Sequence, residues 1–186
     1  MAISAQDKMI HVANKLGLSS LQNMQGSTRV VYDQSPIAGL THVFFSTAQN
    51  RNFPLSNLGA NGNQFQVNEA LLVEQIGFFI PDADDGQNFN SLQFGNLSVK
   101  FDFIIGNKTV MKDVVVEQGG QQAFYTDGTA ASGIITLEGA GILIPPQVEF
   151  SVQALTFSTD TRTASTSRLG VYLFGTAALL NFNTTI

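Results

Sequence analysis

The sequence predicts an all-β protein with one short helix at its N-terminal end. From residue 28 onward, short runs of β-branched and aromatic residues alternate with clusters of Gly, Asn, Asp, Ser and Thr, a pattern typical of strands joined by turns. Ahead of them, apolar residues recur every three or four positions, which is the period of a helix. The length of 186 residues and the uniform strand region favour one domain over 28–186, preceded by an N-terminal arm over 1–27.

The N-terminal arm is predicted to form an amphipathic helix over residues 4–16. Ser4 and Asp7 match the S-x-x-D capping pattern, and Gly17 is placed to end the helix. The apolar positions on one face are Ala5, Met9, Val12, Ala13 and Leu16. A helix of this length is marginal in water by itself. Its apolar face must therefore dock on its own domain, on a neighbouring subunit or on a membrane surface.

Eight segments after the arm are predicted to be strands, because they are rich in β-branched and aromatic residues. They are 28–32, 41–47, 68–80, 97–105, 108–118, 133–137, 147–157 and 168–182. Gly106-Asn107 is a two-residue hairpin signal between the fourth and fifth. In the seventh, a change of phase at Leu155 and Phe157 predicts a bulge or a sheet crossing. Many strands with uneven connections favour an eight-stranded antiparallel jelly-roll β-sandwich.

The chain carries little charge. Nine Lys and Arg and 14 Asp and Glu make up 12% of it, whereas it has 14 Asn and 15 Gln. Cores of protein interfaces are depleted in charge, and amides hydrogen-bond there without the desolvation cost of an ion. The composition indicates a surface that meets other protein, and a low-charge soluble protein is the alternative. Because the basic residues are spread thinly, strong direct nucleic-acid binding is not expected.

The segment 52–65, NFPLSNLGANGNQF, is uncharged and rich in amides. A solvated loop usually carries charge, so we predict that this segment is buried between subunits. Its two Phe would anchor the ends, and its Asn side chains would hydrogen-bond a neighbouring chain. With the apolar face of the helix, the predicted subunit contacts are Phe53, Asn57, Asn61, Asn63, Phe65, Met9, Val12 and Leu16.

The sequence contains no motif for a bound cofactor or for transition-metal coordination. It has two separated histidines and no cysteine, and His42 is expected to be a packed or hydrogen-bonded residue. The weak candidate for Ca²⁺ binding is Asp82, Asp84 and Asp85, which do not match an EF-hand loop and also fit an ordinary solvated turn.

The sequence also offers no catalytic signature. Glu69 and Glu74 lie five positions apart on one predicted strand and are expected to face opposite sides of it. This placement argues against a hydrolase built on that pair of carboxylates. We therefore expect a protein that is not an enzyme.

Three stretches of the chain carry a recognisable pattern. In 52–80, an F-P-x-[ST]-N-L loop leads into a strand of the type V-N-E-A-L-x-[VI]-E-x-[IV]-G-F. ILIPPQVEFSVQAL (142–155) contains I-P-P-Q at the start of a strand, and GVYLFGTAALLNF (170–182) is a closing strand. These stretches resemble coat proteins of small, tailless, icosahedral bacteriophages.

The resemblance implies a capsid subunit with a single jelly roll, which self-assembles into capsomers of an icosahedral shell. Its partners would be copies of itself and other virion proteins. It lacks the Arg-rich arm of many coat proteins, so an internal membrane or a separate genome-binding protein would have to meet the genome. The N-terminus has no continuous apolar core, so we expect no signal peptide. The protein would be made in the host cytoplasm and would reside in the virion.

A β-sandwich carbohydrate- or receptor-binding module, such as a phage spike or vertex domain, is the alternative function. Sugar rings stack on exposed aromatic side chains, and Phe124-Tyr125 is the best candidate patch. The absence of Trp and the presence of only three Tyr count against this alternative.

Overall fold

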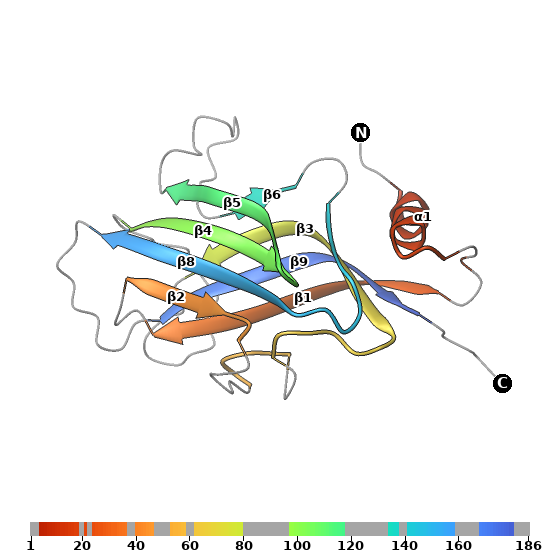
Figure 1. The fold of residues 1–186 in the computed structure, drawn as a ribbon, viewed down its shortest axis with the longest axis horizontal. Coiled ribbons are helices and arrows are strands. Elements are labelled where there is room, and N and C mark those ends of the chain that lie inside the picture. Colours follow the sequence, from red (N-terminus) through yellow and green to blue (C-terminus); the bar gives the residue numbers. More distant parts are fainter. Residues whose placement is uncertain are drawn as a thin grey trace.

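The computed structural model describes residues 4–18, 21, 24–36, 40–46, 53–58, 62–79, 97–117, 134–137, 141–158 and 168–180. In these ranges the chain forms one helix and nine strands, arranged in two antiparallel sheets (Figure 1). The elements are α1 (Ala5–Lys15), β1 (Gln25–Pro36), β2 (Thr41–Phe44), β3 (Glu69–Phe79), β4 (Leu97–Ile105), β5 (Lys108–Glu117), β6 (Ile134–Thr136), β7 (Ile142–Ile144), β8 (Phe150–Ser158) and β9 (Arg168–Leu179).

Strands that precede the turn at Gly106-Asn107 pair with strands that follow it, and the pairs farther from the turn join segments farther apart in the sequence. β4 pairs with β5, β3 with both β6 and β7, β2 with β8, and β1 with β9. Further pairing of β3 with β9 and of β4 with β8 joins these strand pairs into two sheets. The β1 sheet has the order β1-β9-β3-β6, with β7 also on β3, and the β2 sheet has the order β2-β8-β4-β5.

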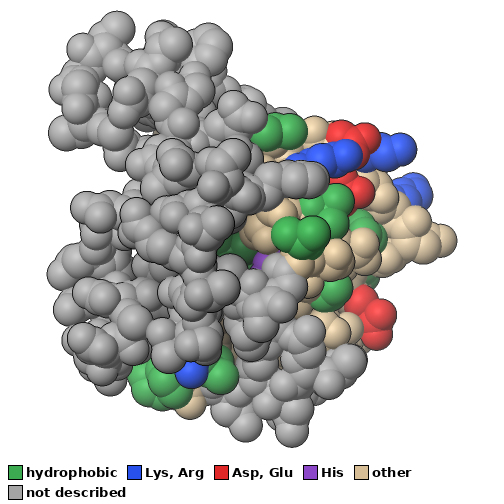
Figure 2. Space-filling view, turned by 90° about the vertical axis from the view of Figure 1, so that its left-hand side faces the viewer, with side chains coloured by type: hydrophobic (Ala, Val, Ile, Leu, Met, Phe, Trp, Pro, Cys, Tyr) green, Lys and Arg blue, Asp and Glu red, His purple; other side chains and the backbone are tan. Residues whose placement is uncertain are grey.

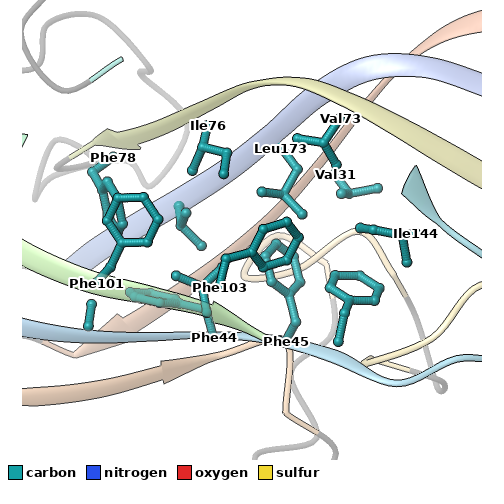
Figure 3. Packing of buried hydrophobic residues seen from close by; sticks show 14 of the residues in the cluster. Val31, Phe44, Phe45, Val73, Ile76, Phe78, Phe101, Phe103, Ile144 and Leu173 are labelled. Carbon is teal, nitrogen blue, oxygen red and sulfur yellow. The ribbon is translucent and has the colours of Figure 1, made fainter. Parts of the chain in front are cut away.

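The hydrophobic core lies between the two sheets. Side chains from both sheets point toward one another there (Figure 3). Phe78 of β3 contacts Phe44 of β2 and Phe101 of β4, with ring centroids 6.3 Å and 5.0 Å apart. All three are buried, and burying a side chain of this size stabilises the fold by about 1.5–3 kcal/mol. These aromatic contacts hold the two sheets face to face.

The prediction of a bulge or a sheet crossing in 147–157 is wrong. β8 pairs with β4 without a shift of register, and its buried positions continue to alternate through Val152, Ala154 and Thr156. Leu155 is 37% exposed. The core-facing position is taken by Thr156, whose Oγ donates a hydrogen bond to the carbonyl oxygen of Leu40 (3.4 Å). A buried polar residue with a hydrogen-bond partner therefore interrupted the apolar pattern, while the strand itself runs on.

A bulge occurs in β3, between Val73 and Gln75. It brings the backbone of β3 close to β9 at Gly175, where an added Cβ would overlap the carbonyl oxygen of Leu72. Only glycine leaves room for this approach. The neighbouring strands are thereby held close across the middle of the β1 sheet.

Helix α1 docks on the outer face of the β1 sheet, near one end of the molecule (Figure 1). Ser4 caps it by accepting a hydrogen bond from the Asp7 backbone N–H (3.1 Å), as the sequence predicted. Val12 is fully buried. It packs in a small apolar cluster with Ala70, Leu72, Ala178 and Leu180. Of the three docking sites that the sequence left open, the structure shows the helix on its own chain.

Candidate interaction surfaces

Asn57 fixes the segment 53–58 against the edge of the β1 sheet that β1 forms. The side-chain Oδ1 of Asn57 accepts from the N–H of Tyr32, and its Nδ2 donates to the carbonyl oxygen of Val30, both at 2.8 Å. The backbone N–H of Asn57 donates to the carbonyl oxygen of Tyr32 (3.4 Å). One residue thus satisfies edge groups that would otherwise pair with another strand. This amide acts within its own chain, whereas the sequence assigned it to a neighbour.

Phe53 is the most exposed large hydrophobic side chain of the described residues, at 77% exposure. It lies just before Ser56 and Asn57, which tie this segment to β1. The sequence predicted Phe53 as an anchor in a subunit contact, and its exposure leaves the side chain available for one. Asn61, a further predicted contact, lies outside the described residues.

The far end of the same segment belongs to the core. Phe65 is buried and stacks on Phe150, with ring centroids 5.4 Å apart. The guanidinium of Arg29 lies 5.1 Å from the centre of the Phe65 ring and pairs with Glu69 (2.9 Å). Asn63 is 8% exposed. The Phe65 side chain is therefore enclosed by its own chain.

The predicted contacts on the helix are likewise turned inward. Val12 is fully buried, and Met9 and Leu16 pack against the same apolar cluster. Lys8 pairs with Glu74 of β3 (2.7 Å), and the hydroxyl of Thr176 donates to the second oxygen of Glu74 (2.6 Å). These contacts fix the side of α1 that faces the sheet.

An uncharged face lies beyond the helix on the outer side of the β1 sheet, and sequence reasoning did not identify it. Val30 is paired with Phe174 and Tyr32 with Tyr172 across β1 and β9. Val30 is 43% exposed, and the other three side chains are half-buried. Burial raises the pKa of both Tyr32 and Tyr172. These four residues form an apolar face with two phenol groups and no charge, and we call it the aromatic face.

The outer side of the β2 sheet is charged. Lys100 pairs with Asp113 (2.6 Å), and Asp102 accepts from the Asp113 backbone N–H (2.6 Å). The hydrogen bond from Lys100 lowers the pKa of the Asp113 carboxyl. Beside them lies an open groove of about 210 Å³, lined in part by Leu155. In Figure 2, basic and acidic side chains lie together near hydrophobic ones over part of the described surface. The two sheets therefore present outer faces of different chemistry.

His42 is a structural residue, as the sequence indicated. It is buried, and its ring nitrogens lie 3.4 Å from the Ser35 hydroxyl and 3.3 Å from the Thr156 hydroxyl. The ring stacks on Phe44, with centroids 6.1 Å apart. A serine beside a histidine can serve as a nucleophile and its base, but both side chains are almost fully enclosed. The group therefore ties β1, β2 and β8 together.

The acidic candidates do not form a cluster. Glu74 lies on the side of β3 that faces the helix and pairs with Lys8, whereas Glu69 lies on the opposite side and pairs with Arg29. The two carboxylates therefore face opposite sides of the strand, as predicted from the sequence. The described residues contain no group of three or more His, Cys, Asp or Glu side chains that could hold a metal ion. Asp82, Asp84 and Asp85 lie outside them, as does Phe124-Tyr125. Among the described helices, none has the length and apolar character needed to cross a membrane.

No family model and no curated protein matches the chain.

Proposed function

We propose that this chain is a structural subunit of an icosahedral bacteriophage capsid, built on a single jelly roll. The pattern of strand pairing carries the proposal. A jelly roll is an eight-stranded double sheet in which the first strand pairs with the last, the second with the seventh, the third with the sixth and the fourth with the fifth. With β6 and β7 taken as two pieces of one strand on β3, the observed pairs follow this order.

Surface chemistry supports the step from fold to function, because jelly rolls also serve lectins and cupins. A capsid subunit must bury parts of its surface against copies of itself. The low charge of the chain, the aromatic face and the exposed Phe53 suit such burial. The resemblance of 52–80 to phage coat proteins points in the same direction.

Phe53 is the contact residue that we assign to the loop in this proposal. Asn57 holds the loop against β1, so Phe53 would be presented to a neighbouring subunit in a defined position. Ile10 on the helix and Leu18 just after its end are 40% and 38% exposed. They are better placed than Val12 to touch a neighbour or another virion protein.

The test is electron microscopy of purified particles, with mass spectrometry of their proteins. We expect the chain to be a component of the shell. A Phe53→Asp variant should fold but fail to assemble, because burying an unpaired charge in an interface is costly. Val110→Asp is the matched control, since β5 already carries Lys108 and Lys112 beside this exposed position. Absence of the chain from particles, together with a monomer at every concentration and salt, would refute the proposal.

A carbohydrate-binding module is the second candidate, and one observation favours it. Tyr32 and Tyr172 are cross-strand neighbours on the aromatic face, and sugar rings stack on such side chains. Against this, the Tyr172 ring lies over Gly77, which leaves less of it for a ligand. Binding on a glycan array that is lost in Tyr32→Ala or Tyr125→Ala would favour this function.

A further inference from the structure

The first four residues of β1, Gln25–Thr28, lie at an edge of the β1 sheet, and we call them the edge segment. β1 is the end strand of this sheet (Figure 1) and pairs with β9 along its whole length. All four residues are exposed. The edge segment contains no charge, no proline and no shift of register, although these features usually keep a sheet edge from pairing with another chain. Its backbone can therefore be approached by another strand.

The other end strands of the two sheets carry such protection. β6 and β7 have three residues each and β2 has four, whereas β1 has 12. β5 carries Lys108 and Lys112, and its pairing with β4 shifts register. Short strands, lysines and bulges all discourage edge pairing. The edge segment differs in this respect from the other described strand edges.

Alternate residues of β1 turn their backbone N–H and C=O groups away from β9. Asn57 identifies these residues, because it bonds the N–H of Tyr32 and the carbonyl oxygen of Val30. The same side of the strand therefore presents the N–H and C=O groups of Gly26 and Thr28. Among the described residues, none bonds to these four groups. Together they offer two donors and two acceptors to a neighbouring strand.

A second copy of the edge segment matches these donors and acceptors. If two copies lie antiparallel with Ser27 opposite Ser27, then Gly26 of each copy lies opposite Thr28 of the other. Each such pair exchanges two hydrogen bonds. Four bonds would join the copies and would use every outward group of Gly26 and Thr28. The contact would be two-fold symmetric, because both copies use the same surface.

Asn57 limits the register of this pairing. If Thr28 lay opposite Thr28 instead, Gly26 would have to pair with Val30 of the second copy. The carbonyl oxygen of Val30 already accepts a hydrogen bond from the Asn57 side chain (2.8 Å). The edge is thus closed beyond Thr28, and the register with Ser27 at the centre uses only the groups that Asn57 leaves open.

The charges near the edge segment are compatible with this register. Arg29 would lie opposite Gln25 of the second copy, so no like charges would face each other across the strands. Arg29 is also paired with Glu69 of its own chain (2.9 Å). Electrostatic repulsion therefore does not oppose the contact.

Helix α1 would add a side-chain contact beside the paired strands. Met9 lies over Gly26, where an added Cβ would be 2.8 Å from the Met9 Sδ. Opposite residues of paired strands keep their side chains on the same side of the sheet. Thr28 of the second copy would therefore lie next to Gly26, and its methyl group would reach Met9. The absence of a side chain at Gly26 leaves space for this contact.

We propose that the edge segment pairs antiparallel with the edge segment of a second copy of this chain, so that two β1 sheets join into one continuous sheet. Its four hydrogen bonds are fewer than the roughly ten of a typical stable interface, so the isolated pair is weak and short-lived. The pairing is a property of the chain alone and does not rest on capsid assembly. In a shell it would act together with the contact at Phe53.

A disulfide test can read this register, because the chain contains no cysteine. In the proposed pair the two Ser27 Cα atoms would lie about 4.5 Å apart, within the range that a disulfide spans. The two Gln25 Cα atoms would lie about 14 Å apart, because four residues separate them along the strands. Oxidised glutathione, which is reduced as the two thiols join, should therefore give disulfide dimers of Ser27→Cys at least about tenfold faster than of Gln25→Cys. Both positions are exposed and lie on the same side of β1, so Gln25→Cys is the matched control.

A second variant tests the backbone bonds. Proline lacks an N–H, so Thr28→Pro removes two of the four bonds between the copies. The N–H of Thr28 points away from β9, and edge strands tolerate proline at such positions, so the variant should still fold, as circular dichroism would verify. Added to Ser27→Cys, Thr28→Pro should slow dimer formation at least about tenfold. Thr28→Val is its matched control, since it keeps the N–H and the branched shape and should leave the rate unchanged.

Two results would overturn the proposal. One is that Gln25→Cys forms dimers as fast as Ser27→Cys, which would indicate random collision or another register. The other is an unchanged rate of dimer formation in folded Thr28→Pro. Both are read on soluble dimers by electrophoresis without reductant. Particles that assemble while Ser27→Cys gives no cross-link would leave the capsid proposal standing and remove this one.

Discussion

Replacing Val12 with alanine should loosen helix α1 from the β1 sheet. Val12 is fully buried against Ala70, Leu72 and Ala178, and Met9 and Leu16 pack beside it. Apart from this apolar cluster, the helix is tied to the sheet by the pair of Lys8 with Glu74. An isolated helix of 11 residues is marginal in water, so its persistence depends on docking.

The magnitude follows from the atoms removed. Alanine lacks two carbons of valine, and each buried carbon contributes about 0.8 kcal/mol. The cavity left behind adds to the loss, while the better helix propensity of alanine returns up to about 0.7 kcal/mol. The net cost is about 1–2 kcal/mol of docking free energy. It corresponds to a factor of about 5–30 in the equilibrium between docked and undocked helix.

Hydrogen exchange of the α1 amides is the assay, because it reports local opening. Exchange should accelerate by that factor in Val12→Ala. The matched control is Ile10→Ala on the same helix, where the side chain is 40% exposed and little change is expected. Equal acceleration in both variants, or none in Val12→Ala, would refute the view that this apolar cluster holds the helix.

Three other outcomes can be measured on the purified protein. Gly175→Ala should lower the free energy of unfolding by about 3 kcal/mol in urea, because the new methyl must displace the backbone of β3 at Leu72; an unchanged midpoint would contradict the close approach. Asn57→Ala should cost about 1–2 kcal/mol for two lost hydrogen bonds, and light scattering should show concentration-dependent association through the exposed β1 edge. The hydrogen bond from Lys100 lowers the pKa of the Asp113 carboxyl. The pair therefore stabilises the fold fully above the ordinary Asp pKa, and this stabilisation is lost as the pH falls through the lowered pKa. An NMR titration should show that the pKa of Asp113 rises in Lys100→Met, and an unmoved pKa would contradict the pairing.

The helix and most strands could be predicted from sequence because their signals are local. The Ser4 cap and the apolar period identified α1, and alternation identified β4. The three-residue strand β7 was missed, since it is too short for a periodic signal and is followed by Pro145 and Pro146. The polar start of β1 at Gln25 was also missed. Gln25 belongs to the strand because it pairs with Leu179 of β9, and the local sequence gives no sign of this pairing.

The interaction surfaces were less predictable, because they depend on which backbones meet. The sequence showed that Asn57 would hydrogen-bond, but it could not show that the nearest partners are Val30 and Tyr32 of the same chain. Exposure separates Phe53 from Phe65, although both were predicted as anchors. The aromatic face combines residues of β1 and β9, so it exists only after the chain ends have come together.

The pairing of β1 with β9 also has a consequence for synthesis on the ribosome. Gln25 is the partner of Leu179, so the β1 sheet cannot close until β9 has left the ribosomal exit tunnel. Contacts so distant in sequence form slowly, and before they form, the nascent chain exposes unpaired strand edges. The hairpin of β4 and β5 needs no such wait. The aromatic face therefore arises only after β9 has emerged, and a partner that requires it cannot bind before β1 and β9 have paired.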